Sequence, residues 1–191
     1  MEPLGGAGAR GRYLDRVPDS RPPSVRRARI ADVRKIKALV DSDAGRVLLE
    51  KDLVTLYEAV QEFWVATNED GTGNGDDDVL GAAALHVLWE DIGELRTVVV
   101  DKAARGRGIG RALVGRLVEE ARELGLKRLF VLTFETSFFA AHGFVEIDGA
   151  PVSHEVYEEM RRSLDPGVAE FLDLPYVKPN TLGNSRMLLE F

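Results

Sequence analysis

The stretch Arg105-Gly106-Arg107-Gly108-Ile109-Gly110-Arg111 governs how the rest of the chain is interpreted. It follows a β-branched run at residues 97–100 and opens the best amphipathic helix pattern in the sequence, residues 108–124. Backbone N–H groups at the start of a helix lack internal partners, and glycines let an anion approach them. The stretch therefore predicts a phosphate-binding turn. A turn that only joins a strand to a helix fits the same residues equally well.

The composition narrows the class of protein. The chain has 191 residues, of which 45% are hydrophobic, enough for one compact domain. Its net charge of −7 argues against a nucleic-acid partner. Residues 102–111 are locally basic, so the sign of the charge there is opposite to that of the whole chain. A polyanionic cofactor is one explanation for that reversal.

The composition also argues against several classes of protein. The chain has no cysteine, so disulfides and thiolate nucleophiles are excluded, and its three histidines are scattered. No apolar run is long enough to cross a membrane. We therefore expect no metal, no membrane contact and a cytoplasmic location.

The pattern along the chain predicts one α/β domain with a mixed sheet. Residues 1–24 are rich in Gly, Pro and Arg and are interpreted as a disordered leader, with the domain at 25–191. A strand–helix–strand crossover over 94–134 implies parallel neighbours, whereas the strands before it form hairpins. The predicted strands are 25–30, 63–66, 79–89, 94–100, 127–134, 144–147 and 185–191, the predicted helices are 33–44, 52–60, 108–124, a short one ending at 143, and 153–163, and 165–183 is expected to be irregular.

These features together resemble the GNAT acetyltransferase superfamily. The turn fits the pattern Arg/Gln-x-x-Gly-x-Gly/Ala from Arg105 to Gly110, and a short helix ending at Gly143-Phe144 follows one strand later. The resemblance covers residues 25–191 and implies acetyl-CoA as co-substrate in a splayed mixed sheet flanked by helices. The residues that it implies for the cofactor are Val98, Val99, Val100, Arg105, Gly106, Arg107, Gly108, Ile109, Gly110, Arg111, Leu132 and Thr133.

Four further pieces resemble the acetyltransferase domain of the N-acetylglutamate synthase family, in its short single-domain bacterial form. They are residues 45–51, 93–94, 130–133 and 184–186, in that order along the chain. The resemblance implies transfer of acetyl to L-glutamate, the first step of arginine biosynthesis. Without cysteine no acetyl-cysteine intermediate can form, so we expect direct attack in a ternary complex. The residues implied for the acceptor are Leu49, Lys51, Glu94, Arg96, Ser185 and Arg186.

Glu94 and Ser185 are the candidate catalytic residues. An amino group is mostly protonated at neutral pH, so a base is needed, and Glu94 stands at the start of the strand before the turn. Strand alternation places Arg96 on the same face. Ser185 matches the family serine, which binds substrate or stabilises the thiolate. The plain alternatives are a solvated glutamate and a strand-edge hydroxyl.

The chain departs from the family in ways that keep alternatives open. Lys51 stands where the family often has arginine, Gly183 replaces another arginine, and Phe139 replaces a tyrosine found in many members. Only 24 residues precede the predicted domain, so no arginine feedback domain is expected. L-Glutamine or another small amine is then an alternative acceptor, and a non-catalytic acetyl-CoA sensor is a further alternative. A homodimer is left open.

Overall fold

The protein is described by a computed structural model over residues 23–43, 51–68, 78–176 and 183–191. Most of the predicted leader therefore lies outside the described residues. The elements are β1 Ser24–Arg27, η1 Ile30–Asp32, α1 Val33–Asp43, α2 Leu53–Glu58, η2 Val60–Glu62, β2 Phe63–Thr67, β3 Val79–Trp89, β4 Ile92–Val100, η3 Lys102–Ala104, α3 Ile109–Glu123, β5 Arg128–Thr133, α4 Thr136–Ala140, β6 Val145–Glu146, α5 His154–Met160, α6 Pro166–Phe171 and β7 Ser185–Glu190.

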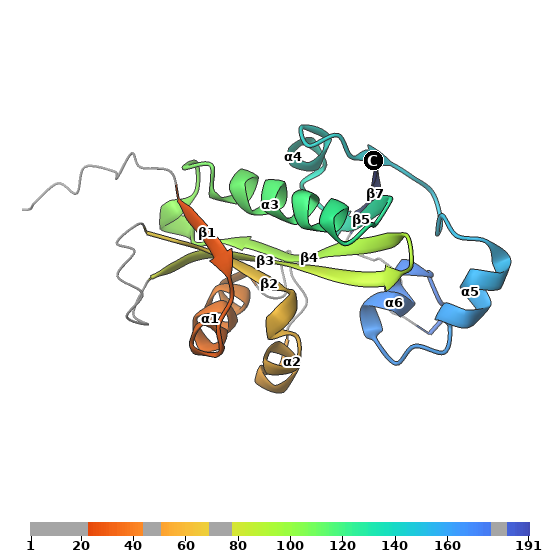
Figure 1. The fold of residues 1–191 in the computed structure, drawn as a ribbon, viewed down its shortest axis with the longest axis horizontal. Helices are drawn as coiled ribbons and strands as arrows, with labels where there is room; N and C mark the ends of the chain where they lie inside the picture. Colours follow the sequence, from red (N-terminus) through yellow and green to blue (C-terminus); the bar gives the residue numbers. More distant parts are fainter. Residues whose placement is uncertain (1–22, 44–50, 69–77, 177–182) are drawn as a thin grey trace, which may run out of the picture.

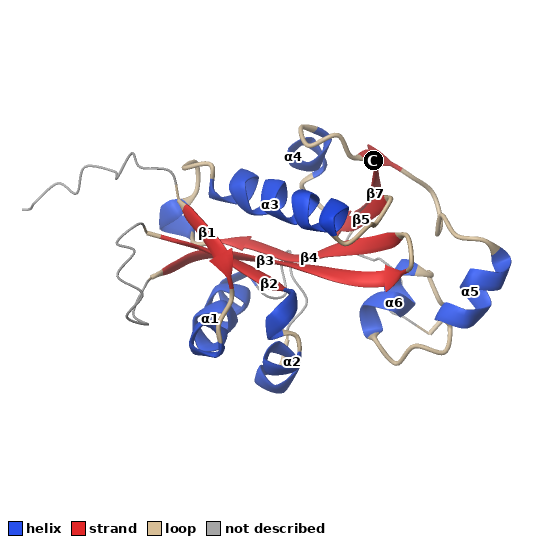
Figure 2. Cartoon of the chain, viewed as in Figure 1, coloured by secondary structure: helices blue, strands red, loops and turns tan. Residues whose placement is uncertain are grey.

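A seven-stranded mixed sheet organises the molecule, in the order β1-β2-β3-β4-β5-β7-β6. The first four strands pair antiparallel, β4 and β5 pair parallel across the α3 crossover, and β5, β7 and β6 are again antiparallel. The predicted mixed α/β sheet is thereby confirmed (Figure 2). No helix in the described part of the chain is long and apolar enough to cross a membrane.

Helices cover both faces of the sheet. α3 and α4 lie on one face, and α1, α2 and α6 lie on the other (Figure 1). The α3 face is built on fully buried aliphatic side chains such as Leu113, Leu117 and Leu129. The opposite face is divided into two cores, one under α1 and α2 around Ile36 and Leu56, and one that includes Phe171 of α6. Polar side chains can therefore lie on this face of the sheet, between the two cores.

Sequence predictions for residues 165–183 and for α3 need correction. The segment 165–183, expected to be irregular, contains α6, with Asp165 as its N-cap and a proline at its first position. The helical periodicity of residues 108–124 predicts Leu124 on the buried face of α3 and Glu120 away from it, but Leu124 follows the last helical residue and is 57% exposed. Glu120 of the same helix is instead buried, and its carboxylate accepts hydrogen bonds from Arg27 and Trp64.

The small residues of β3 allow α3 to pack closely on the sheet. A Cβ at Gly81 would lie 2.9 Å from Ile109 Cγ2, 3.0 Å from the Val99 carbonyl oxygen and 3.2 Å from Leu113 Cδ1. These distances are shorter than side chains tolerate in a packed interior. Gly81 thus sets how near α3 comes to the strands that lead into the glycine turn.

We predict that Gly81→Ala lowers the free energy of unfolding by about 1–3 kcal/mol, because the added methyl overpacks the α3 contact. Urea denaturation measures the change. Gly115→Ala is the matched control: its Cβ meets no atom within 4 Å, so the variant should be as stable as the parent chain or more so. Equal stabilities for the two variants would contradict this account of the packing.

Candidate functional site

The parallel strands β4 and β5 separate after three paired positions. Their register runs from Ile92↔Arg128 to Glu94↔Phe130 and stops there, although β4 continues to Val100 and β5 to Thr133. The second half of β5 pairs only with β7 on its other side. The backbone groups that β4 and β5 turn toward each other beyond Glu94 are therefore not used in this pairing, and a split opens within the sheet.

A β-bulge in β4 lies directly beside this split. Ala82 pairs with Val99 and Ala84 pairs with Arg96, so two residues of β4 stand opposite one residue of β3. Thr97, inside the bulge, has φ of +55°, which is unfavourable for a β-branched residue. The bulge bends β4 locally and shifts its alternation by one residue, so that Leu95 before it and Val98 and Val100 after it all lie against the α3 core.

The glycine turn ends the split at the start of α3. Gly106 and Gly108 have φ of +79° and +78°, and no atom lies within 4 Å of where their Cβ atoms would be. Gly108 is the N-cap of α3, and the first hydrogen bond of the helix runs from Ala112 N to Gly108 O at 3.0 Å. The N–H groups of residues 109–111 precede that bond, so the helix itself leaves them available to an anion.

A cavity of about 610 Å³ joins the split to the turn. It is lined from one side by β4 and the turn, and from the other by β5 and α4. All the residues predicted for the cofactor line it except Arg107: they are Val98, Val99, Val100, Arg105, Gly106, Gly108, Ile109, Gly110, Arg111, Leu132 and Thr133. Their role in cofactor binding stays a prediction.

Cations and aromatic rings complete the cavity wall. Lys102, Arg105 and Arg111 line it at the turn, and Phe138 and Phe139 of α4 line it opposite. The Lys102 ammonium group also donates a hydrogen bond to the Ser42 carbonyl, at 2.7 Å, which connects the turn to the end of α1. The sequence predicts Thr136 or Ser137 as the cap of α4, but the N-cap is Glu135 and no side chain caps the helix.

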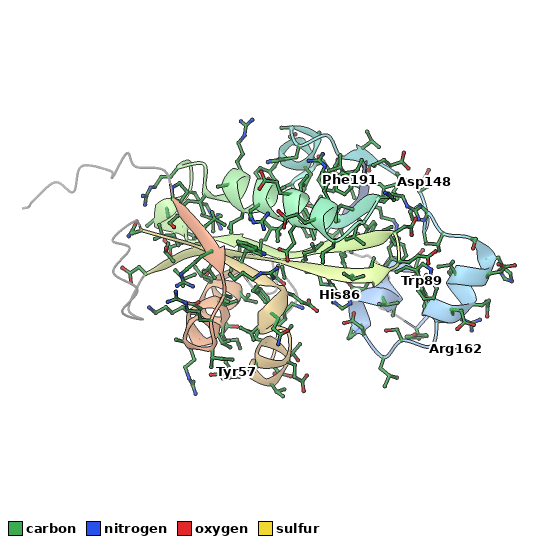
Figure 3. The ribbon with its side chains drawn as sticks, in the orientation of Figure 1. Tyr57, His86, Trp89, Asp148, Arg162 and Phe191 are labelled. Atoms are coloured by element: carbon green, nitrogen blue, oxygen red, sulfur yellow. The ribbon has the colours of Figure 1, made fainter. Side chains whose placement is uncertain are left out.

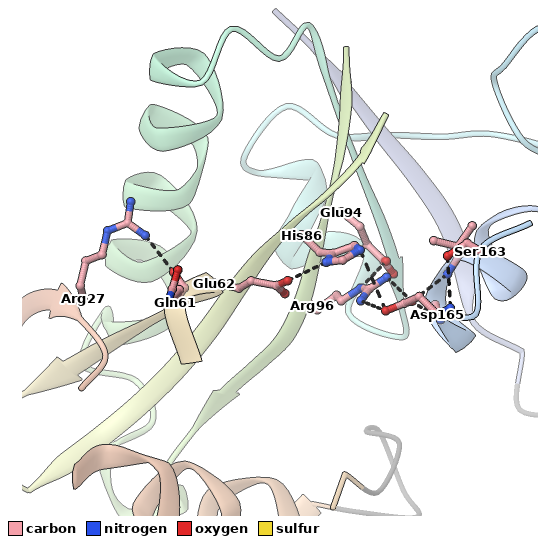
Figure 4. A network of polar contacts seen from close by, with 10 residues as sticks. Arg27, Gln61, Glu62, His86, Glu94, Arg96, Ser163 and Asp165 are labelled. Atoms are coloured by element: carbon pink, nitrogen blue, oxygen red, sulfur yellow. Dashed lines mark hydrogen bonds and ion pairs between the residues drawn. The ribbon is translucent and has the colours of Figure 1, made fainter. Parts of the chain in front are cut away.

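On the face that carries α6, Glu94 and Arg96 form a buried ion pair. Arg96 Nε donates to Glu94 Oε2 at 2.6 Å, so the predicted shared face brings the two side chains into contact. The two terminal nitrogens of Arg96 donate to the two oxygens of Asp165, at 3.0 and 2.8 Å. Figure 4 shows this chain of contacts from β4 to the N-terminus of α6.

The surroundings shift the pKa values of Glu94 and Asp165 in opposite directions. Burial raises the pKa of Glu94, and the charge and hydrogen bond of Arg96 oppose this rise without cancelling it. Burial also raises the pKa of Asp165, but there the hydrogen bonds and charge of Arg96 outweigh it and hold the pKa at about 2. Glu94 is thus the more basic of the two carboxylates that share Arg96.

His86 extends the network toward α2. It pairs with Glu94 across the β3–β4 ladder, and its Nδ1 lies 2.8 Å from Glu62 Oε1, while its Nε2 lies 4.0 Å from Asp165 Oδ2. Figure 3 shows the histidine on the face of the sheet that carries α6. The sequence identifies no partner for His86 and favours a structural role, whereas the structure gives it acidic neighbours from two other elements.

The remaining acceptor candidates lie in different places. Arg186 donates to the carbonyl oxygens of Gly149 and Glu170, both at 3.1 Å, and to that of Phe171, so it holds the end of α6. Ser185 lies on the opposite face by strand alternation, with Met187, and its hydroxyl donates to Glu146 Oε1 at 2.7 Å.

Lys51 is half-buried, and its charge lowers the pKa of the Glu170 carboxyl, although burial raises that pKa more. Lys51 is therefore near the α6 side of the network. Leu49 lies outside the described residues, so its predicted role is unaffected by the structure. Among the described residues no three His, Asp or Glu side chains gather as a metal site would need.

Sequence reasoning missed Asp165, Glu62 and the partnership of His86. Asp165 stands before a proline, which is a helix-start signal, and this signal would have placed α6 correctly. Counting from the two-residue turn between β3 and β4 would place Val87 opposite Glu94, but an irregularity between Val87 and Trp89 shifts the register by one residue and places His86 there. Glu62 comes from a separate element, and only the assembled fold brings it to the histidine.

Comparison with known proteins assigns the family. A family model described as "Acetyltransferase (GNAT) family" matches residues 34–148. The amino-acid acetyltransferase of Mycobacterium tuberculosis strain H37Rv is 66% identical over 167 residues, covering 87% of this chain and 94% of that protein. The chain belongs to the GNAT acetyltransferase family, which confirms the predicted class of enzyme and fold.

Structures of relatives agree with this assignment. A crystal structure of Rv2747 from Mycobacterium tuberculosis in complex with CoA and NLQ matches with a TM-score of 0.83 at 66% identity, covering 88% of this chain and 99% of that chain. N-acetylglutamate synthase from Neisseria gonorrhoeae, complexed with CoA and N-acetyl-glutamate, matches with a TM-score of 0.66 over 88% of this chain and 35% of that chain. At 22% identity the second match supports the fold alone.

Longer relatives carry much that this chain does not match. The amino-acid acetyltransferase of Yersinia enterocolitica is 32% identical over 145 residues, which are 73% of this chain and 31% of that protein. The family model ends at residue 148, before α5 and α6. Asp165 therefore lies in a part of the chain that the family model does not describe.

We predict that Asp165 stabilises the fold only where it is ionised. Its folded pKa of about 2 lies below the ordinary 3.8, so the stabilisation is present above pH ~4 and is lost as the pH falls toward 2. Asp165→Asn should lower the free energy of unfolding by about 1–2 kcal/mol at pH 7, a modest value because water screens a side chain that is 32% exposed. Urea denaturation between pH 7 and 3 should show the difference from the parent chain shrinking below pH 4; a constant difference would contradict the assignment.

Proposed function

We propose that the protein transfers an acetyl group from acetyl-CoA to the α-amino group of L-glutamate, as an N-acetylglutamate synthase at the first step of arginine biosynthesis. The observation that carries the proposal is the split between β4 and β5, which begins beside a buried carboxylate and ends at a glycine turn. The 66% identical mycobacterial relative is called an amino-acid acetyltransferase, which supports an amino acid as the acceptor.

The residues around the cavity fit acetyl-CoA. Its pyrophosphate needs donors and cations, and the turn offers the N–H groups of residues 109–111 with Arg105 and Arg111 nearby. Its pantetheine arm needs main-chain partners, and β4 beyond Glu94 is not paired with β5. The relative whose structure contains CoA covers nearly the whole of this domain, which supports the same cofactor here.

Glu94 acts as the general base in this proposal. Acetyl-CoA supplies the acetyl thioester, and the acceptor amine attacks directly in a ternary complex. The ammonium group of the amino acid must first lose a proton, and a carboxylate takes it more readily when its pKa is raised toward neutrality. Burial raises the pKa of Glu94 in that direction. The charge and hydrogen bond of Arg96 favour the ionised form of the same carboxylate and so oppose part of this rise.

The acceptor carboxylates require cations. Lys51, on the α6 side of the network, is assigned to one of them, and Arg96 and Arg186 contribute positive charge to the same region. We assign Leu49 to the acceptor pocket from the family resemblance alone. Ser185 is assigned to the thiol side of the split, because it pairs with Thr133 at the open end of β5.

L-Glutamine is a second candidate acceptor. Gly183 stands where the related family often has arginine, and its φ of +77° is a conformation that favours glycine. Arg186 has hydrogen bonds to three backbone carbonyls, so part of its donor capacity is already used. A neutral amide in the acceptor side chain needs no second cation, which favours glutamine on this observation.

A panel of acceptors tests the proposal. At fixed acetyl-CoA we expect CoA release with L-glutamate or L-glutamine well above that with other amino acids or with no acceptor. A thiol reagent measures the release without background, because the chain has no cysteine. Turnover with glutamine alone would replace the first candidate with the second. No turnover with either would overturn both.

The base assignment makes its own prediction. Glu94→Gln should lower kcat by about 10²–10⁴-fold, the usual contribution of a positioned base, while acetyl-CoA binding measured by calorimetry stays near that of the parent chain. Because the base works when deprotonated, kcat/KM of the parent enzyme should fall as the pH drops through the raised pKa of Glu94, and the variant should lose that acid limb. Glu158→Gln, on the exposed face of α5, is the control. An unchanged kcat in Glu94→Gln would remove the residue from catalysis.

A further inference from the structure

Arg96 is held between two carboxylates that come from different parts of the chain. Its Nε donates to Glu94 Oε2 at 2.6 Å, and its two other nitrogens grip Asp165 in a bidentate pair. The Arg96 side chain is only 13% exposed, so its fork has one orientation that satisfies both partners. The position of the guanidinium group is therefore fixed from the α6 side as well as from β4.

The first turn of α6 is shaped around that guanidinium group. A Cβ at Gly167 would lie 2.7 Å from Arg96 Cζ and would also clash with one of its terminal nitrogens. The φ angle of Gly167 is not in the left-handed region, so its backbone conformation does not require glycine. The reason for glycine at this position is the space that Arg96 occupies.

Asp165 connects the helix to the arginine. Its Oδ1 accepts hydrogen bonds from the backbone N–H groups of Gly167 and Val168, at 2.7 and 3.1 Å, and so caps α6. The same carboxylate makes the bidentate pair with Arg96. A single side chain thus fixes the start of the helix and the guanidinium group together.

α6 itself is anchored in the core. Phe171 is fully buried and meets the ring of Phe130 edge-on, with centroids 5.0 Å apart. Phe130 is the β5 residue that pairs with Glu94 at the last position before the split. The helix therefore packs on the strand next to the carboxylate that its cap positions through Arg96.

We propose that α6 is the positioning element of the candidate base. Asp165 binds the guanidinium group of Arg96, Gly167 leaves the space that this group occupies, and Arg96 holds the Glu94 carboxylate beside the split. This inference rests on the proposed function of Glu94. Asp165 and Gly167 are positioning residues, because they act through Arg96 and not on the substrate. Both lie beyond the residues that the family model matches.

The charges around Glu94 determine whether a change in α6 makes this carboxylate more basic or less basic. It is faced by His86 from β3, by Arg96 on its own strand, by Glu170 from α6 and by Arg186 from β7, with Asp165 behind Arg96. Removing the charge of Asp165 leaves Arg96 paired with Glu94 alone, which makes Glu94 less basic. Displacing Arg96 with a methyl group removes the positive neighbour, which makes Glu94 more basic.

Two variants and two matched controls test the proposal in the full-length chain. In Asp165→Asn the amide oxygen still caps α6, and in Gly167→Ala the helix gains a better helix former. We expect kcat to fall about tenfold or more in each, with acetyl-CoA affinity retained. The acid limb of kcat/KM should move to lower pH in Asp165→Asn and to higher pH in Gly167→Ala.

The controls separate positioning from general damage. Gly115→Ala places a methyl on α3 where nothing lies within 4 Å, and Asp91→Asn breaks a carboxylate–arginine pair with Arg128 at the β3–β4 turn. Both should keep the kcat and the acid limb of the parent chain. Circular dichroism and thermal melts establish that each variant is folded. Gly167→Ala keeps the Asp165 side chain, although the new Cβ would lie 3.0 Å from Asp165 Oδ1, and this variant carries the test if Asp165→Asn unfolds.

The outcomes are distinct. If Glu94→Gln loses activity but both α6 variants keep the parent kcat and acid limb, the positioning role is overturned and the base assignment stands. If both acid limbs move in the same direction, or neither moves while kcat falls, α6 is only structural and the proposal is also overturned. If Glu94→Gln keeps its kcat, the base assignment fails and the positioning role falls with it.

Discussion

The early end of pairing between β4 and β5 is the constraint on which the rest of the site depends. Two parallel strands that stayed paired would satisfy each other's backbone groups and leave no space within the sheet. Here pairing stops at Glu94↔Phe130, and the freed backbone faces a cavity of about 610 Å³. The Thr97 bulge bends β4 at this point, and its left-handed φ is an unfavourable conformation that the β3–β4 ladder holds in place.

The split also assigns separate chemistry to the two faces of the sheet. On one face, β4 leads to the glycine turn and the start of α3, where donors and cations suit a polyanion. On the other face, Glu94, Arg96 and His86 occupy the strip between the α2 core and the α6 core. Because strand alternation places neighbouring residues on opposite faces, one strand serves both sides. β4 is therefore the element that joins the site proposed for the cofactor to the site proposed for the acceptor.

Local patterns predicted the parts of the fold that depend on local signals. The glycine turn, the long helix predicted at residues 108–124 and the mixed sheet follow from glycine positions and periodicity, and the structure agrees with them, with α3 at Ile109–Glu123. α6 was missed although Asp165-Pro166 is a helix-start signal, because the helix is six residues long and the surrounding segment lacks periodicity. The contact between Arg96 and Asp165 spans 69 residues, and no local pattern encodes it. Glu120, expected on the outer face of α3, is buried because Arg27 and Trp64 bind its carboxylate.

The buried charges on the α6 face are not explained by stability alone. Taking Glu94 and Arg96 out of water is costly, and well-packed apolar side chains of similar volume commonly serve a fold equally well or better. Once Glu94 is buried, however, Arg96 becomes necessary, because an unpaired buried carboxylate is strongly destabilising. Arg96 in turn has donors beyond those that Glu94 can accept, and Asp165 accepts them. Each member of the network thus follows from the one before it, and the first member, Glu94, is the one whose burial needs a reason from chemistry and not from packing.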